Sequence, residues 1–233
     1  MDSACVIVPA LDAAATLGRV IDDLEAVLGP SGLTLIVIDD GSSDATADVA
    51  RARGVVLLRH ARNRGKGAAL RAGLREAQRR GHATAVTVDA DGQHPAASAK
   101  VVLEAGADPR ALVLGVRDLF RDGAPRSNRF GNDVSNFFLS LFARRTLRDT
   151  QCGLRRYPVE ATLALGARAD GYAFEGEVVL RALAAGLPLV EVPIAVRYPA
   201  QGDQVSHFRR VLDPTRIVAT VVRTVVELRL GGS

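Results

Sequence analysis

The stretch LTLIVIDDGSSDATADVARAR, residues 33–53, shows the pattern that decides the fold. It opens with a continuous apolar run at Leu33–Ile38, passes through an acidic turn, and ends in a segment of helical periodicity at Asp44–Arg53. A short apolar run without polar alternation is typical of a strand that is buried on both faces of a sheet. The stretch therefore predicts one strand–turn–helix unit of an α/β protein.

The same unit recurs through the first half of the chain. Further strands are predicted at Ala4–Val8, Val55–Leu58, Ala83–Val88 and Ala111–Val116, and further helices at Thr16–Leu28, Lys66–Arg80 and Pro95–Ala105. Ser43 is the predicted N-cap of the helix at Asp44–Arg53, and Gly54 and Gly81 are predicted to end two of the helices. The alternation indicates the α/β class with a mostly parallel, doubly wound sheet.

The pattern changes after residue 116. Leu119–Arg129 is polar and is predicted to be a loop, and Leu187–Tyr198, split by Pro193, is predicted to form two short edge strands. Helices are expected at Asn132–Ala143, Val159–Leu165 and Phe174–Ala185. We expect one domain over residues 1–208, with a nucleotide-binding half at about 1–116 and an acceptor half at about 117–208, followed by a C-terminal amphipathic helix within 209–233.

Composition narrows the class of protein. The chain has 233 residues, of which 48% are hydrophobic, enough for a sizeable core. The net charge is +4, and lysine occurs only at 66 and 100, so nearly all the positive charge is arginine; we expect no nucleic-acid partner. The two cysteines, Cys5 and Cys152, do not form a disulfide framework, and Cys5 is predicted to be a buried thiol. No secretory leader or membrane-spanning run is evident, which indicates a cytoplasmic protein.

Two acidic clusters each follow a predicted strand. Asp39 and Asp40 are placed to accept hydrogen bonds from a nucleobase or ribose in the crevice at the carboxyl ends of the strands. Asp89 and Asp91, with the neutral oxygen of Gln93, form a set of hard ligands that suits Mg²⁺ or Mn²⁺ bridging a diphosphate. The alternatives are a helix-capping turn for the first cluster and a surface turn for the second.

A glycine-bearing turn, Asn63-Arg64-Gly65-Lys66-Gly67, opens the third helix. Its glycines allow a close approach of the backbone to a ligand, or a tight turn. The full spacing of a phosphate-binding loop is absent, so an NTPase is discounted.

These blocks, together with Pro9-Ala10, occur in the order seen in family 2 glycosyltransferases. Through Asp149-Thr150-Gln151-Cys152-Gly153-Leu154-Arg155 the chain resembles in particular the polyprenyl-phosphate mannose and glucose synthases of the dolichyl-phosphate type. The resemblance extends from about residue 4 to about residue 208. It implies a GT-A fold, a nucleotide-diphosphate sugar donor and inversion at the sugar carbon.

The resemblance also implies roles for individual residues. Donor binding falls to Pro9, Ala10, Asp12, Asp39, Asp40, Lys66, Asp89, Ala90, Ser206 and His207. Mn²⁺ or Mg²⁺ falls to Asp89, Asp91 and Gln93, and catalysis to Asp91, Arg117, Arg126, Arg129 and Gln151. The family usually has tyrosine, asparagine and glutamate after Pro-Ala, where this chain has Leu11, Asp12 and Ala13, so the choice between UDP and GDP stays open.

The charged residues of the predicted acceptor side indicate the chemical class of the acceptor. The candidate acceptor side carries Arg117, Arg121, Arg126 and Arg129, which favours a phosphate acceptor over the alternative of a solvated basic loop. A hydroxyl acceptor needs a base instead, for which Asp149, Glu175 and Glu177 are the candidates. The leading hypothesis is hexose transfer to a polyprenyl phosphate. The alternatives are transfer to a hydroxyl acceptor, and an inactive nucleotide-binding module.

The C-terminal segment Arg209–Leu230 has a broad apolar face ringed by arginines. Three interpretations remain open. The segment lies in an anionic membrane interface at the inner membrane face, packs on its own domain, or pairs with a second copy as a homodimer.

Overall fold

A computed structural model describes residues 3–106, 108–119, 126–197 and 212–230. The described strands form one seven-stranded sheet in the order β3-β2-β1-β4-β6-β5-β7. Their bounds are β1 (Ala4–Ala10), β2 (Thr34–Asp39), β3 (Val56–Arg59), β4 (Thr84–Thr87), β5 (Leu112–Val116), β6 (Arg155–Pro158) and β7 (Leu189–Pro193). Strands β1 to β4 are mutually parallel, and β5 is parallel to β7, so the predicted mostly parallel α/β sheet is confirmed.

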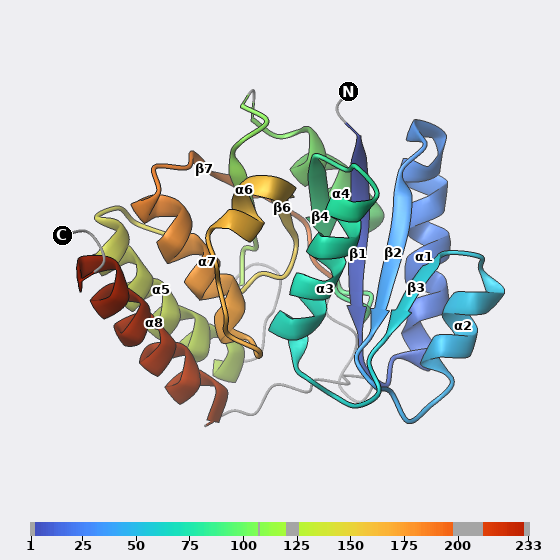
Figure 1. Ribbon diagram of the computed structural model, residues 1–233, viewed down its shortest axis with the longest axis horizontal. Helices are drawn as coiled ribbons and strands as arrows, with labels where there is room; N and C mark the ends of the chain where they lie inside the picture. Colours follow the sequence, from blue (N-terminus) through green and yellow to red (C-terminus); the bar gives the residue numbers. More distant parts are fainter. Residues whose placement is uncertain (1–2, 107, 120–125, 198–211, 231–233) are drawn as a thin grey trace.

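Helices cover the sheet and extend past its β7 end (Figure 1). Their bounds are α1 (Ala14–Leu28), η1 (Gly29–Ser31), α2 (Thr46–Ala52), α3 (Lys66–Arg79), α4 (Ala96–Glu104), α5 (Arg126–Ala143), α6 (Val159–Ala164), α7 (Ala173–Ala184) and α8 (Leu212–Leu230). Side chains alternate between the two faces along each strand. Ile7 and Ile36 pack in one hydrophobic cluster with α3 and α7, whereas Val6 and Val37 pack in a second cluster with α1 and α4.

Strand β6 was not predicted, and it lies in the middle of the sheet. It runs antiparallel to both β4 and β5. Arg155 is fully buried there, and its guanidinium donates hydrogen bonds to the backbone oxygens of Thr150 (2.7 Å), Cys152 (2.8 Å) and Glu175 (2.8 Å). Because this strand contains two arginines and a proline in place of an apolar run, its burial depends on tertiary partners that hydrophobic periodicity does not detect.

Three local predictions are wrong. Helix α5 begins at Arg126, inside the predicted loop, because a first helical turn needs no apolar face and periodicity therefore places the start too late. Ser43 is no N-cap: α2 begins at Thr46, whose N–H donates to Asp44 (2.9 Å). Residues 194–197 form no second edge strand, since the Ala195 oxygen accepts a hydrogen bond from Ser98 and the Arg197 N–H donates to Gln93.

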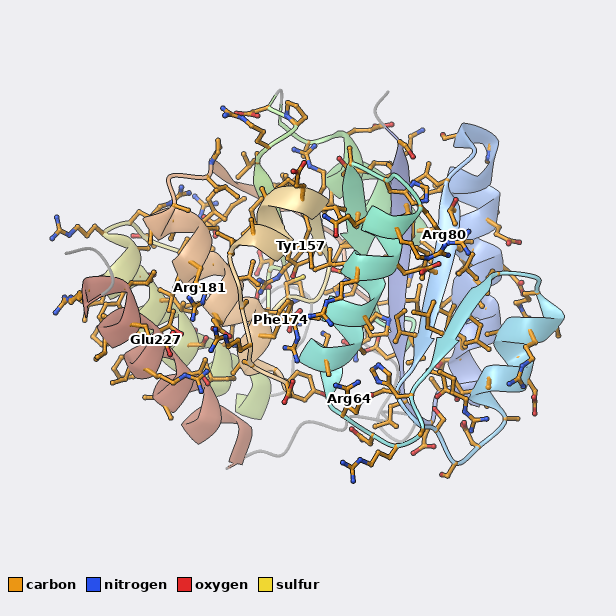
Figure 2. The ribbon with its side chains drawn as sticks, viewed as in Figure 1. Arg64, Arg80, Tyr157, Phe174, Arg181 and Glu227 are labelled. Atoms are coloured by element: carbon orange, nitrogen blue, oxygen red, sulfur yellow. The ribbon has the colours of Figure 1, made fainter. Side chains whose placement is uncertain are left out.

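The described part of α8 packs on its own domain. Ile217 and Val221 are buried in the core cluster that includes residues of α5 and α7, and Arg181 of α7 forms an ion pair with Glu227 of α8 at 2.5 Å (Figure 2). The interpretation that this segment packs on the domain is therefore confirmed for its inner face. Within the described residues, no helix is long and apolar enough to cross a membrane.

Candidate active site

The predicted site residues gather at one edge of the sheet. Strand β1 starts beside the N-terminus at the top of Figure 1, so the carboxyl ends of the parallel strands lie at the bottom. Asp39 ends β2, Asp89 follows β4, and Arg117 follows β5. Because β6 is antiparallel to its neighbours, its amino end lies at this same edge and brings residues 149–153 to the site.

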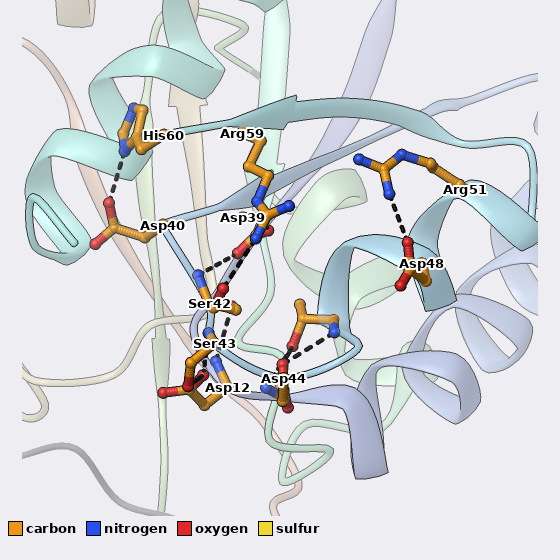
Figure 3. Close-up of polar contacts among 12 residues, drawn as sticks. Asp12, Asp39, Asp40, Ser42, Ser43, Asp44, Asp48, Arg51, Arg59 and His60 are labelled. Atoms are coloured by element: carbon orange, nitrogen blue, oxygen red, sulfur yellow. Dashed lines mark hydrogen bonds and ion pairs between the residues drawn. The ribbon is translucent and has the colours of Figure 1, made fainter. Parts of the chain in front are cut away.

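The first acidic cluster is held by hydrogen bonds and ion pairs within the protein (Figure 3). Asp39 is fully buried, accepts the N–H of Ser42 (2.8 Å), and pairs with Arg59 (3.0 Å). The Asp40 carboxylate contacts His60 Nδ1 (2.6 Å) and accepts the backbone N–H groups of Arg64 (3.0 Å) and Gly65 (2.7 Å). Asp40 thus anchors the glycine-bearing turn that leads into α3.

Asp12 connects the first two loops of this edge. Its backbone has a φ of 45°, a left-handed conformation that aspartate tolerates better than most residues. Its carboxylate accepts the N–H (2.8 Å) and the hydroxyl (3.0 Å) of Ser43, and its own N–H donates to the hydroxyl of Ser42 (2.9 Å). These bonds tie Asp12, a predicted donor-binding residue, to the loop that follows β2.

The second acidic cluster is built around Lys66, the first residue of α3. The Lys66 ammonium lies 2.7 Å from Asp89 and 3.3 Å from Glu175. Burial by itself lowers the pKa of Lys66, but the charges of Asp89 and Glu175 outweigh burial and raise it, so the side chain stays charged. Burial acts to raise the pKa of Asp89, and the Lys66 charge reverses this and lowers it.

Asp91 is the carboxylate of this cluster whose charged form is disfavoured. Burial, and then the charge of Asp89, raises the pKa of Asp91 to about 6. Its carboxylate accepts the N–H of Gln93 at 2.9 Å, and within the described residues it has no ion-pair partner. His94 next to it is buried, and burial lowers its pKa to about 4, so its ring is neutral at pH 7.

This donor set fits a divalent cation that is shared with a ligand. Asp89 and Asp91 supply hard carboxylate oxygens, and their mutual repulsion is what a cation beside them would relieve. Among the described residues, however, no three His, Cys, Asp or Glu side chains are close enough to hold a metal alone. A Mg²⁺ or Mn²⁺ ion here would need oxygen ligands from a second molecule, which is how Mg²⁺ is usually bound beside phosphates.

Arg117 and Gln151 are held by neighbours. Arg117 pairs with the fully buried Asp149 through two side-chain nitrogens, Nε at 2.7 Å and Nη2 at 2.9 Å. Gln151 donates through Nε2 to the hydroxyl of Ser135 in α5 at 2.8 Å. The segment before β6 is therefore tied both to the end of β5 and to α5.

The remaining predicted residues fall into two groups. Pro9 and Ala10 are buried at the end of β1, and the oxygen of Ala90 accepts a hydrogen bond from Thr16 at 2.6 Å. The backbones of Arg126 and Arg129 lie in the first turns of α5, but their side chains are outside the described part of the structure. Arg121, Ser206 and His207 lie outside the described residues altogether.

Gly153 is a site residue that sequence reasoning quoted without a role. A Cβ atom at this position would lie 2.2 Å from an Asp89 carboxylate oxygen and 2.7 Å from the Lys66 ammonium. Only glycine allows the segment before β6 to approach the Lys66–Asp89 pair this closely. The glycine in the block 149–155 was the available signal, but its partner is recognisable only once β6 is placed beside β4.

The candidate bases differ in their surroundings. Glu177 accepts the N–H groups of Arg168 (2.9 Å) and Ala169 (2.8 Å) and pairs with Arg181 (2.8 Å), so it serves the packing of α7. Asp149 is bound by Arg117 as described above. Glu175, which is 3% exposed, faces Lys66 and thereby belongs to the second acidic cluster.

Comparisons with known proteins agree with this geometry. The family model described as "Glycosyl transferase family 2" matches residues 5–161. An uncharacterized protein of Methanocaldococcus jannaschii is 32% identical over 203 residues, which cover 84% of this chain and 82% of that protein. The UDP-N-acetylglucosamine–dolichyl-phosphate N-acetylglucosaminyltransferase of Methanococcus voltae is 29% identical over 217 residues, covering 83% of this chain and 85% of that enzyme.

Among solved structures, the fold resembles glucosyl-3-phosphoglycerate synthase from Mycobacterium tuberculosis, crystallised with Mn²⁺, UDP and phosphoglyceric acid. The TM-score is 0.73 at 22% sequence identity, and the match covers 96% of this chain and 78% of the other. This likeness confirms the predicted GT-A fold. Together with the family match, which spans more than half of the sequence, it shows that the chain belongs to glycosyl transferase family 2 and is a glycosyltransferase.

Proposed function

We propose that this enzyme transfers a hexose from a UDP- or GDP-sugar to a polyprenyl-phosphate acceptor, with inversion at the sugar carbon and with Mn²⁺ or Mg²⁺ as cofactor. The observation that carries the proposal is the pair Asp89 and Asp91 at the carboxyl edge of the sheet. Burial, and then the charge of Asp89, raises the pKa of Asp91 to about 6, so this carboxylate is a buried acid that lacks a compensating positive charge next to it. A diphosphate-bound cation completes such a site.

The donor would lie across both acidic clusters. The loops of Asp12, Asp39 and Asp40 line the end near β1 and β2, where the nucleoside is proposed to bind. The diphosphate is proposed to lie next to Asp89, Asp91 and Gln93. The cation, when bound, supplies charge that stabilises the departing nucleoside diphosphate.

Lys66 holds Asp89 in position through their 2.7 Å contact and contributes a fixed positive charge beside the leaving group. The surrounding residues keep this charge in place: Glu175 contacts Lys66 from α7, and Gly153 leaves room for the pair. The chain's own contribution to the reaction is therefore a preorganised electrostatic site rather than a mobile one.

A phosphate acceptor is favoured because the candidate bases are already engaged. Asp149 is paired with Arg117, Glu177 with Arg181, and Glu175 lies next to Lys66. A hydroxyl acceptor requires a carboxylate that can take its proton, whereas a phosphate is already an anion and needs only orientation and charge pairing. Arg117 and the α5 arginines Arg126 and Arg129 are the proposed partners of that phosphate. The Methanococcus voltae relative is named for a dolichyl-phosphate acceptor, which supports the same class.

A lipid acceptor would bring the enzyme to the inner face of a membrane. The outward side of α8 carries Val222 and Val226, which are 50% and 49% exposed. This pair supports peripheral attachment at a bilayer interface. The homodimer through α8 stays a prediction.

The test is calorimetric binding of UDP and of GDP, each with and without Mn²⁺, to the wild type, to Asp91→Ala and to the matched control Asp48→Ala. Asp48 is a suitable control because it is an aspartate of α2, outside both acidic clusters, and its side chain is 77% exposed. We expect one nucleotide to bind tightly only with Mn²⁺, and that binding to be lost in Asp91→Ala but kept in Asp48→Ala. Binding of neither nucleotide by the folded protein would refute the donor proposal.

Transfer assays then decide the acceptor. Radiolabelled sugar should move to a short-chain polyprenyl phosphate and not to the matching polyprenol or to free sugars. Transfer to the hydroxyl compounds instead would refute the phosphate acceptor and leave the donor site intact. Tight nucleotide binding without any turnover would indicate a nucleotide-binding module.

A further inference from the structure

A cavity of about 260 Å³ lies away from the acidic clusters. Residues of α3, of α6, of the segment after α6 and of α7 line it. Phe174 of α7, seen between α7 and α3 in Figure 2, and Leu74 of α3 form part of its apolar wall. The volume is slightly below the range of about 300–1,000 Å³ that is usual for ligand pockets, so a small molecule fits and a nucleotide does not.

The charged groups that line this cavity are all arginines: Arg71 and Arg75 of α3, and Arg168 of the segment after α6. Arg71 is held in place by the Ala169 oxygen and the Asp170 carboxylate, and it also lies over the Phe174 ring at 5.7 Å. Within the described residues, the side chains of Arg75 and Arg168 have no ion-pair partner, although both are exposed. Positive charge is thus concentrated around an apolar hollow.

The wall of the cavity also contains a buried hydroxyl without a hydrogen bond. Thr162 of α6 is 3% exposed, and its Oγ1 has no partner among the described residues. Because the Oγ1 atom itself has almost no accessible surface, the polar contacts to a ligand in the cavity fall to the arginines.

We propose that this cavity binds a small phosphomonoester, with the phosphate between Arg75 and Arg168 and a short carbon chain against Leu163, the partly exposed apolar residue of the lining. Guanidinium groups match phosphate through paired N–H donors, and a doubly charged phosphate suits several of them better than a carboxylate does. The shared chemistry is a phosphate on a short carbon chain, whether in a free metabolite or in a lipid headgroup.

The cavity adjoins the catalytic edge through the segment after α6. The Asp170 oxygen accepts the N–H of Ala68 at 3.2 Å, and a Cβ at Gly67 would lie 2.3 Å from the Ala169 oxygen. This segment therefore packs against the turn that carries Lys66. A ligand held by Arg168 contacts the same short segment that supports the start of α3.

The test measures binding of glycerol 3-phosphate and of inorganic phosphate by calorimetry at constant ionic strength. The test variant is Arg75→Gln/Arg168→Gln, which leaves Arg71 and its contacts untouched. The matched control is Arg79→Gln/Arg110→Gln, which removes the same charge from arginines that are 67% and 78% exposed and do not line the cavity. Thermal unfolding checks that both variants are folded.

We expect the wild type and the control to bind glycerol 3-phosphate more tightly than inorganic phosphate, and the test variant to bind it at least about tenfold more weakly. Vesicles with and without phosphatidic acid form a second arm. If only phosphatidic acid vesicles bind, and the test variant alone loses that binding, the ligand is a lipid headgroup. Absence of binding in both arms, or equal weakening in the test and control variants, would overturn the proposal.

Discussion

The two acidic clusters follow strands of the same sheet but use their carboxylates differently. Asp39 and Asp40 are buried and are satisfied by backbone N–H groups, by Arg59 and by His60. Asp89 pairs with the Lys66 ammonium, whereas Asp91 has no ion-pair partner within the described residues and its pKa is raised to about 6. The two acidic turns look alike in sequence but differ in role. The first holds the loops together, whereas the second retains unbalanced negative charge. Unbalanced charge is what a ligand or cation can use.

The largest effect is expected from neutralising the unbalanced cluster. Asp91→Asn should lower kcat/KM for sugar transfer by roughly 10³-fold, because a cation and diphosphate lose a charged ligand while the fold is kept. Steady-state kinetics provide the measurement, with the donor and acceptor that the binding and transfer assays select. Asp48→Asn is the control, and a loss of similar size there would contradict the assignment.

The next effect tests the close approach of the segment before β6 to this cluster. Gly153→Ala should lower kcat/KM by roughly 10²-fold, since the added methyl would lie 2.2 Å from the Asp89 carboxylate and must displace it or Lys66. Overpacking should also reduce the free energy of unfolding by about 1–3 kcal/mol. Gly171→Ala, where a Cβ meets nothing within 4 Å, is the matched control. If Gly153→Ala kept wild-type kinetics, the site would accommodate the added methyl group and the prediction would be wrong.

The first cluster should respond in stability. Asp40→Ala should reduce the free energy of unfolding by about 3 kcal/mol, because two backbone N–H groups and His60 lose a buried carboxylate partner. Urea denaturation of the metal-free protein measures this. Asp48→Ala, an exposed acid, should change stability by less than about 0.5 kcal/mol. An unchanged midpoint for Asp40→Ala would remove the distinction between the clusters.

The smallest effect is a pH dependence of the metal-free protein. The folded-state pKa of Asp91, about 6, lies above its ordinary value of 3.8, so the folded state holds its proton more tightly. The resulting stability is fully present below about pH 3.8 and is lost as pH rises through about 6. Asp91→Asn, which is neutral throughout, should therefore be about 1–2 kcal/mol more stable than the wild type at pH 7.5.

That difference should shrink as pH falls below 6, and addition of Mn²⁺ should reverse it by stabilising only the wild type. Thermal unfolding between pH 4 and pH 8 provides the curve. Parallel pH profiles for the two proteins would show that the pKa of Asp91 is not raised in the folded state, and would remove the electrostatic argument for a cation site.

Prediction from the sequence was most accurate where local pattern and tertiary environment agree. The apolar runs ending at Ile38 and Val88 are strands that are buried on both faces, so their composition alone identifies them. Gly54 and Gly81 follow α2 and α3 with φ of 66° and 79°, as expected for residues that end helices. The prediction of a buried Cys5 is confirmed, since its side chain is fully buried.

Prediction failed where the burial of polar groups depends on distant partners. Arg155 reads as a surface residue, yet three backbone oxygens that come from outside its strand satisfy its guanidinium inside the core. Ser43 reads as a helix cap, yet its donors are taken by Asp12 from another loop. No local pattern contains such partners.

The sequence by itself determined the α/β class, the family and the two acidic turns, because strand burial and short motifs are properties of neighbouring residues. Only the tertiary structure decided which acidic turn is paired within the protein and which carries unbalanced charge. It also brought Lys66 and Gly153 to Asp89, and Glu175 to Lys66, from distant parts of the chain. Electrostatic balance and close packing depend on distances in space, and residues that are far apart in the chain set those distances only after the sheet has formed.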